Sequence, residues 1–203
     1  MAREASRVGT LTGWMDRTLY PSHGDHWDDT LFRRFLEARI GPKDRVLDYG
    51  AGRGLSEMEF RGCSGTVAGV DPDPAVLGNP FIDEARLLEP PEFLIPYDDG
   101  SFDLVFSDNV LEHVEHPEVC FREIHRVLRP GGIFVSKTPN KWHYVPTLAR
   151  LTPHAFHVFV NRVRGREAED TFPTLYRCNT PKLVERVAGG TDFELREIEM
   201  WEG

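Results

Sequence analysis

Short runs of consecutive apolar residues recur along the chain, and segments rich in glycine, proline and charge separate them. A strand that is buried on both faces shows such a run, whereas a half-exposed strand alternates apolar and polar residues. We therefore expect buried strands of a parallel sheet at residues 45–50, 66–71, 85–89, 101–108 and 133–139.

Amphipathic helices are predicted before and between these strands. Residues 27–40 repeat apolar side chains at helical spacing, and Asp28 and Asp29 lie at the end where the helix dipole favours negative charge. Residues 117–128 form a second such segment, which Pro130-Gly131-Gly132 should end. The predicted inward faces are Leu31, Phe35, Leu36 and Ile40 in the first helix, and Val119, Ile124, Val127 and Leu128 in the second.

The remaining segments give shorter or weaker patterns. Residues 54–62 predict one or two helical turns, and residues 180–190 a helix with Thr180 as its cap and Pro181 at its first position. Residues 193–201 alternate and predict a last, half-exposed strand. The fold class that follows is α/β, with a doubly wound and mostly parallel sheet.

Composition and charge narrow the class of protein. A chain of 203 residues suits one domain, and no apolar run reaches the length of a membrane span. The formal net charge of −9 argues against a duplex nucleic acid partner, which usually requires a basic face. The N-terminal residues lack the apolar core of a secretory signal, and the three cysteines form no metal or disulfide pattern. We expect a cytoplasmic protein.

The stretch VLDYGAGRG, residues 46–54, ends the first predicted strand and is the main candidate for chemistry. Gly50 and Gly52 allow the backbone to approach a ligand or to take a positive φ. Asp71 ends the next strand, where an acid can accept both hydroxyls of a ribose. A dinucleotide fingerprint would carry a third glycine where Leu55 stands, and Asp48 better suits a ligand with a positive amino group.

Four motifs in order resemble those of class I S-adenosylmethionine-dependent methyltransferases: LDYGAGRG, GVDPDP, IPYDDGSFDLVFSDNVLEHV and REIHRVLRPGGIFVSKTPN. The resemblance covers roughly residues 28–140 and is closest to the small-molecule branch, similar to the ubiquinone-biosynthesis type. It implies a Rossmann-like methyltransferase fold, S-adenosylmethionine as cofactor and S-adenosylhomocysteine as product. The family sheet normally ends in two antiparallel strands, and only residues 193–201 supply a candidate for one of them.

The resemblance also divides the chain. Residues 1–27 would form an arm over the cofactor and residues 28–139 the cofactor-binding core. Residues 140–179, rich in aromatic and basic side chains, would be a helical or loop lid that selects the acceptor. Residues 180–203 would complete the core with a helix and a strand.

Matching positions carry the family's roles over to particular residues. The turn would hold the methionine part of the cofactor, and the acid after the second strand the ribose. The adenine contact must shift, because Pro91 has no N–H to donate. The cofactor-binding residues that the resemblance implies are Tyr20, Asp48, Tyr49, Gly50, Ala51, Gly52, Asp71, Pro72, Glu92, Phe93, Asp108 and Asn109.

Methyl transfer from a sulfonium is an in-line displacement that needs a base only if the acceptor keeps its proton until late. His113 is the candidate base, or alternatively orients a loop. His143, Tyr144 and Arg162 are candidates for the acceptor pocket. We expect no metal, although His113/His116 and His154/His157 share an H-x-x-H spacing. Two alternatives stay open: a methyltransferase-like binding or regulatory subunit without turnover, and a nicotinamide-dependent oxidoreductase.

Overall fold

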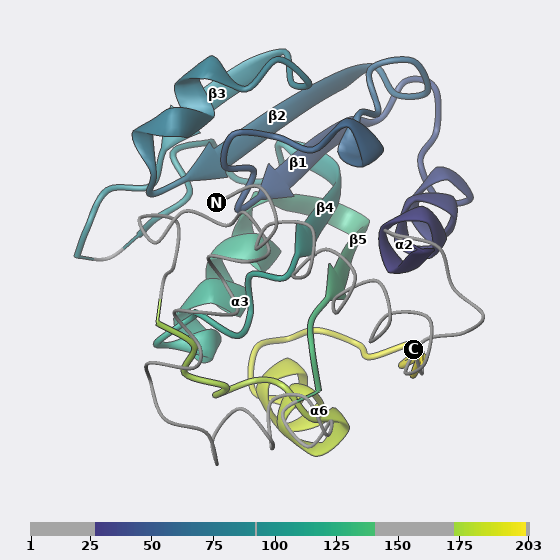
Figure 1. Cartoon of the computed structure of the whole chain (residues 1–203). Helices are drawn as coiled ribbons and strands as arrows, with labels where there is room; N and C mark the ends of the chain where they lie inside the picture. The colour runs from purple at the N-terminus through teal and green to yellow at the C-terminus, as the bar shows by residue number, and fades with distance from the viewer. Residues whose placement is uncertain (1–26, 92, 141–172, 202–203) are drawn as a thin grey trace, which may run out of the picture.

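The computed structural model describes residues 27–91, 93–140 and 173–201. Its centre is one sheet of five strands in the order β3-β2-β1-β4-β5, and every neighbouring pair is parallel (Figure 1). The strands are β1 (Arg45–Tyr49), β2 (Thr66–Asp71), β3 (Glu84–Leu87), β4 (Phe102–Asp108) and β5 (Leu128–Lys137). The predicted parallel sheet is therefore confirmed.

The winding of the chain reverses beside β1. Strands β2 and β3 extend the sheet on one side of β1, and β4 and β5 extend it on the other. In register, Asp48 pairs with Gly69 of β2 and with Phe106 of β4. The carboxyl ends of β1, β2 and β4 therefore meet at one edge of the sheet, which is where open α/β folds bind their ligands.

Alternate residues of the central strands enter two separate cores. Leu47 and Val105 pack on the face covered by α3 (Pro117–Val127) and α6 (Pro181–Gly189). Val46 and Leu104 pack on the face covered by α2 (Trp27–Glu37). Burial on both faces explains why these strands are written as unbroken apolar runs. In the ranges that the structure describes, no helix is long and apolar enough to cross a membrane.

The predicted inward face of the first helix is confirmed at Leu36 and Ile40, which are buried, but not at Leu31 and Phe35. Phe32 and Leu36 are fully buried, whereas Leu31 is 36% exposed. Phe35 is half-buried and lies under the guanidinium of Arg39, 3.4 Å from its ring centroid. The sequence LFRRFL offers two overlapping apolar stripes, and contact between the rings of Phe32 and Phe106 selects one of them.

The other predicted helices fare differently. Helix α6 begins as expected, because the Thr180 side chain accepts the N–H of Leu183 and Pro181 follows it. Helix α3 ends at Val127, and strand β5 starts at Leu128. The prediction that Pro130-Gly131-Gly132 ends the helix is therefore wrong, because these residues lie inside the strand. The connections after β1 and β2 contain only short 3-10 turns, η1 (Ser56–Met58) and η2 (Pro74–Gly78).

The prediction of a last strand at residues 193–201 is wrong. These residues take no strand conformation, and Leu195, Ile198 and Met200 are all exposed. Their alternation therefore does not mark a buried face. Two aromatic side chains hold the segment instead: Phe193 packs against Phe134 on one face of β5, and Trp201 joins the core on the other.

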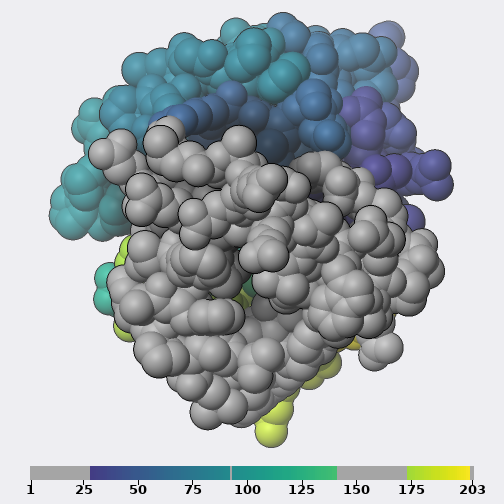
Figure 2. Space-filling view, viewed as in Figure 1, coloured from purple at the N-terminus to yellow at the C-terminus, as the bar shows by residue number. Residues whose placement is uncertain are grey.

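The space-filling view places the described parts relative to one another. The N-terminal half of the described residues, coloured purple to teal, forms one continuous surface along the top and right of this view (Figure 2). Most of the predicted lid, and the predicted arm up to residue 26, lie outside the described residues.

Candidate functional site

Three aspartates lie at the last or next-to-last position of the three strands that meet at the carboxyl edge. Asp48 and Asp71 are each 7% exposed, and the side chain of Asp108 is 9% exposed. Burial raises the pKa of Asp48 well above its usual value, and the charges of Asp108 and Asp71 raise it further. Burial also raises the pKa of Asp71. Because like charges are gathered here in a desolvated place, a cationic ligand is strongly favoured.

The glycine turn brings bare backbone to the same edge. Gly50, Gly52 and Gly54 all take a positive φ, of 90°, 45° and 84°. A Cβ on Gly50 would lie 2.3 Å from Cγ2 of Val110, so that position also requires glycine for space. The glycines therefore allow a tight turn whose N–H groups bond within the fold: those of Gly50 and Ala51 to the carbonyl of Val70, and that of Gly54 to the carbonyl of Ala51.

The carboxylate of Asp71 is fixed by the backbone around it. The N–H of Gly52 donates to Oδ2 at 2.9 Å, and the N–H of Asp73 donates to Oδ1 at 2.8 Å. Each oxygen keeps a second lone pair for a ligand hydroxyl. Pro72, the next residue, is exposed. Asp71 therefore links the glycine turn of β1 to the end of β2.

Two of the predicted binding residues have their side chains in the hydrophobic cores. The ring of Tyr49 is buried in the core, where its hydroxyl lies beside the thiol of Cys120. The Cβ of Ala51 packs in the opposite core, and its carbonyl accepts the side-chain amide of Asn79 at 3.1 Å. Any contact that these two residues make with a ligand must come from their peptide groups.

Asp108 has one satisfied oxygen and one that is not. Its Oδ1 accepts Nζ of Lys137 at 2.9 Å and Nδ2 of Asn109 at 2.9 Å. Its Oδ2 is buried and has no hydrogen-bond partner. Burial raises the pKa of Asp108 to about 6, although Lys137 opposes the rise. Asn109 itself is exposed and takes a left-handed conformation, with φ 52°.

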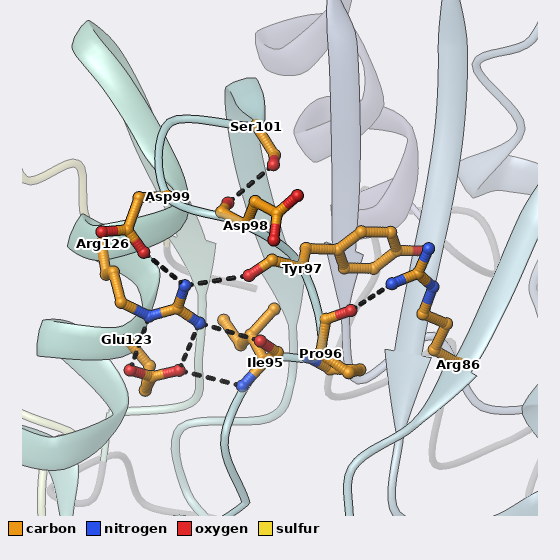
Figure 3. Close-up of polar contacts among 9 residues, drawn as sticks. All are labelled: Arg86, Ile95, Pro96, Tyr97, Asp98, Asp99, Ser101, Glu123 and Arg126. Carbon is orange, nitrogen blue, oxygen red and sulfur yellow. Dashed lines mark hydrogen bonds and ion pairs between the residues drawn. The ribbon is translucent and has the colours of Figure 1, made fainter.

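A loop between β3 and β4 reaches the same edge and is anchored to α3 (Figure 3). Arg126 donates to the carbonyls of Ile95 and Tyr97, at 2.8 and 2.9 Å, and pairs with Glu123. Glu123 in turn accepts the N–H of Ile95 at 3.0 Å. Phe93, two residues earlier, is 43% exposed with φ 50°. The anchor holds the backbone that follows the predicted adenine position.

Comparison with known proteins agrees with this geometry. Residues 47–136 match the family described as Methyltransferase domain. A protein of Mycolicibacterium smegmatis named as a probable S-adenosylmethionine-dependent methyltransferase is 30% identical over 178 residues, which are 79% of this chain and 66% of that protein. The chain thus contains a methyltransferase domain, and its relatives support a class I S-adenosylmethionine-dependent methyltransferase.

Two further similarities place this methyltransferase domain among known structures and sequences. An uncharacterized methyltransferase of Synechocystis sp. is 32% identical over 117 residues, 54% of this chain and 55% of that protein. Phosphoethanolamine N-methyltransferase 2 of Haemonchus contortus, solved with S-adenosyl-L-methionine, has a TM-score of 0.56 and 19% identity. That alignment covers 81% of this chain and 36% of the other and shows a shared fold. The chain spans between half and two thirds of the length of the Synechocystis and Mycolicibacterium relatives.

His113, the candidate base of the methyltransferase domain, follows β4 as predicted. Its Nδ1 lies 3.3 Å from the carbonyl oxygen of Pro173, and its Nε2 lies 4.0 Å from Glu112. The Glu112 side chain is buried and accepts the hydroxyl of Thr138 at 3.0 Å. These contacts of His113 thus join the segment after β4 to Pro173, near the end of the predicted lid.

The remaining predicted site residues of the methyltransferase domain cannot be placed. Tyr20, Glu92, His143, Tyr144 and Arg162 lie outside the described residues.

Sequence reasoning missed several residues of the site. Asn79 bridges the glycine turn to the segment after η2, and a Cβ on Gly54 would lie 2.2 Å from its Oδ1. In the sequence Gly78-Asn79-Pro80, Asn79 has the pattern of an ordinary turn residue. Lys137 was also passed over, although a lysine that ends an otherwise apolar strand is itself a signal of a buried charge partner.

Proposed function

We propose that the methyltransferase domain binds S-adenosylmethionine at the carboxyl edge of β1, β2 and β4 and catalyses transfer of its methyl group to a small-molecule acceptor. The observation that carries the proposal is the group of three aspartates beside the glycine turn: Asp48 and Asp71 are buried, and the side chain of Asp108 is only 9% exposed. The cofactor's sulfonium supplies an activated methyl group and one positive charge, and its amino group supplies another.

The residues present fit that ligand. Asp48 would face the ammonium, because it is buried and the charges of Asp108 and Asp71 lie near its own. Asp71 would accept ribose hydroxyls on the lone pairs that the backbone leaves open. The unpartnered Oδ2 of Asp108 marks a further place for positive charge. Adenine would lie between exposed Pro72 and Phe93.

For the reaction, the chain's part is to position the reactants and to exclude water. His113 would accept the acceptor's proton if the acceptor carries one, with Pro173 and Glu112 fixing the orientation of its ring. His143, Tyr144 and Arg162 would shape the acceptor pocket. Among the branches of the family, we favour the small-molecule branch similar to the ubiquinone-biosynthesis type, on the motifs that run from residue 47 to residue 140.

Calorimetry with S-adenosylmethionine, S-adenosylhomocysteine and NAD tests the binding step. We expect micromolar binding of the first two and none of NAD. Asp71→Asn should abolish that binding. Asp83→Asn is the matched control, because Asp83 also accepts a backbone N–H, that of Val67, but at the amino end of β2. Binding of NAD without S-adenosylmethionine would reject the proposal in favour of the oxidoreductase reading.

Transfer is tested separately with S-adenosylmethionine that carries a tritiated methyl group and a mixture of small metabolites that has passed a dialysis membrane. Label that moves from the cofactor into other small molecules, with wild type but not with Asp71→Asn, supports an enzyme that acts on small molecules. Binding without any transfer would favour a subunit that has lost turnover. Label retained with protein or RNA would contradict the acceptor class.

A further inference from the structure

Lys137 joins three carboxylates from two different elements. It ends β5 directly beside Asp108, with which it is in register on β4. Its Nζ lies 2.9 Å from Oδ1 of Asp108 and 3.2 Å from Oδ2 of Asp28, and it also donates to Oδ1 of Asp29. The last two acids belong to the first turn of α2. The side chain of Lys137 is only 10% exposed, so these contacts are its main compensation for burial.

Three carboxylates surround the single positive charge of Lys137, and they approach it from two sides. Asp108 faces it from the side of the cofactor edge, and Asp28 and Asp29 face it from the side of the helix. The Lys137 ammonium also lies 5.6 Å from the ring centroid of Phe32, which holds it on the α2 side. One positive charge is therefore shared among three negative ones.

Only one oxygen of Asp108 is used in this network. Oδ1 accepts both Lys137 and Asn109, while Oδ2 is buried without a partner. A buried carboxylate oxygen in that state is costly, and a cation brought to it would relieve the cost. The unpartnered oxygen is the independent observation that this end of the network awaits positive charge.

The aspartates of α2 decide how Lys137 acts on such a cation. Without them, the whole charge of Lys137 would be directed at Asp108 and would repel a second cation nearby. Asp28 and Asp29 neutralise part of the positive charge of Lys137 from the side away from Asp108. The carboxylate of Asp108 therefore keeps its attraction for a cationic ligand. Since the proposed ligand and its product differ by one positive charge, the effect falls on only one of them.

We propose that the network Asp28–Asp29–Lys137–Asp108 sets the preference of the site for the sulfonium of S-adenosylmethionine over the uncharged thioether of S-adenosylhomocysteine. The inference rests on the proposed function and deepens it by assigning product discrimination to a helix outside the matched family region. Asp28, Asp29 and Lys137 act as positioning residues through Asp108. The ammonium group is common to both ligands, so the ratio of the two dissociation constants isolates the sulfonium.

Calorimetry at pH 8 on the full chain tests the network in both directions. For Asp28→Asn/Asp29→Asn, we expect the ratio of the dissociation constant of S-adenosylmethionine to that of S-adenosylhomocysteine to rise about tenfold, which corresponds to one lost charge interaction of moderate strength. For Lys137→Met, the ratio should fall by a similar factor. Glu37→Gln is the matched control, because it breaks the Arg33 ion pair on the same helix and should leave the ratio unchanged.

Equal weakening of both ligands in the double variant would overturn the inference, because it would show a clamp that only supports the fold. That double variant needs little repacking, since Asp28 is 46% exposed and asparagine keeps the shape of aspartate. If Lys137→Met fails to fold, the double variant alone decides the outcome. Failure of the wild type to bind either ligand would instead overturn the proposed function, so the two failures are distinguishable.

Discussion

Replacing Gly50 by alanine should cost more than replacing any glycine that meets only one constraint. At φ 90° an L side chain is strained by about 1–2 kcal/mol. The new Cβ would also lie 2.3 Å from Cγ2 of Val110, and such overpacking costs about 1–3 kcal/mol. The sum, about 2–5 kcal/mol, is a large part of the 5–15 kcal/mol that stabilises a typical domain.

Two other glycines separate these contributions. Gly131 has φ 84° and nothing within 4 Å of its ideal Cβ, so Gly131→Ala should show the backbone cost alone. Gly69 has no positive φ, but its Cβ would lie 2.7 Å from Cδ1 of Ile82 and 2.8 Å from Cβ of Ala51, so Gly69→Ala should show crowding alone. Urea denaturation followed by tryptophan fluorescence measures the free energy of unfolding of each variant.

A double variant provides the sharpest check. Val110→Ala removes the two methyl groups that the new Cβ would meet, so in its background Gly50→Ala should cost only about 1–2 kcal/mol. The reasoning would be refuted if Gly50→Ala were no more destabilising than Gly131→Ala, or if Val110→Ala failed to reduce its cost.

Two more predictions concern charged groups. Because the pKa of Asp108 is raised from 3.8 to about 6 in the fold, its ionised form opposes folding above pH 6 and has no effect below about pH 4. Asp108→Asn should therefore raise the free energy of unfolding by up to about 3 kcal/mol at pH 8 and leave it unchanged at pH 4, and a constant difference across that range would contradict the assignment. Arg126→Gln should cost about 2 kcal/mol in thermal denaturation, because it frees the carbonyls of Ile95 and Tyr97 and the partly buried Glu123. Arg129, three residues after Arg126, forms an exposed ion pair with Asp103, so Arg129→Gln should cost less than about 1 kcal/mol. Equal losses in the two variants would refute the anchoring role of Arg126.

Features that depend on neighbours in sequence were predicted well. The buried strands were recognisable because both of their faces enter a core, which leaves an unbroken apolar run. The N-terminus of α6 was recognisable because Thr180 and Pro181 act locally on the first turn. The glycines of the turn after β1 were recognised for the same reason, since a positive φ is a local property.

Features that depend on distant partners were predicted poorly. The rotation of α2 follows from packing of Phe32 on Phe106, which lies on β4 and is remote in sequence. Residues 193–201 have the alternation of a strand, yet they are held by the packing of Phe193 and Trp201 and by an ion pair between Glu197 and Arg39. Asn79 and Lys137 entered the site only because their partners, Ala51 and Asp108, come from other strands or turns.

The strand order has a consequence for co-translational folding on the ribosome. Strand β1 is synthesised first, but its partner β4 follows much later, since Asp48 is in register with Phe106. At translation rates of about 5–20 residues per second, the β4 side of β1 stays open for roughly 2–7 seconds after β2 can close the other. The central strand of the sheet is thus the one that nascent-chain chaperones would meet longest, and slowing translation between β3 and β4 would prolong that exposure.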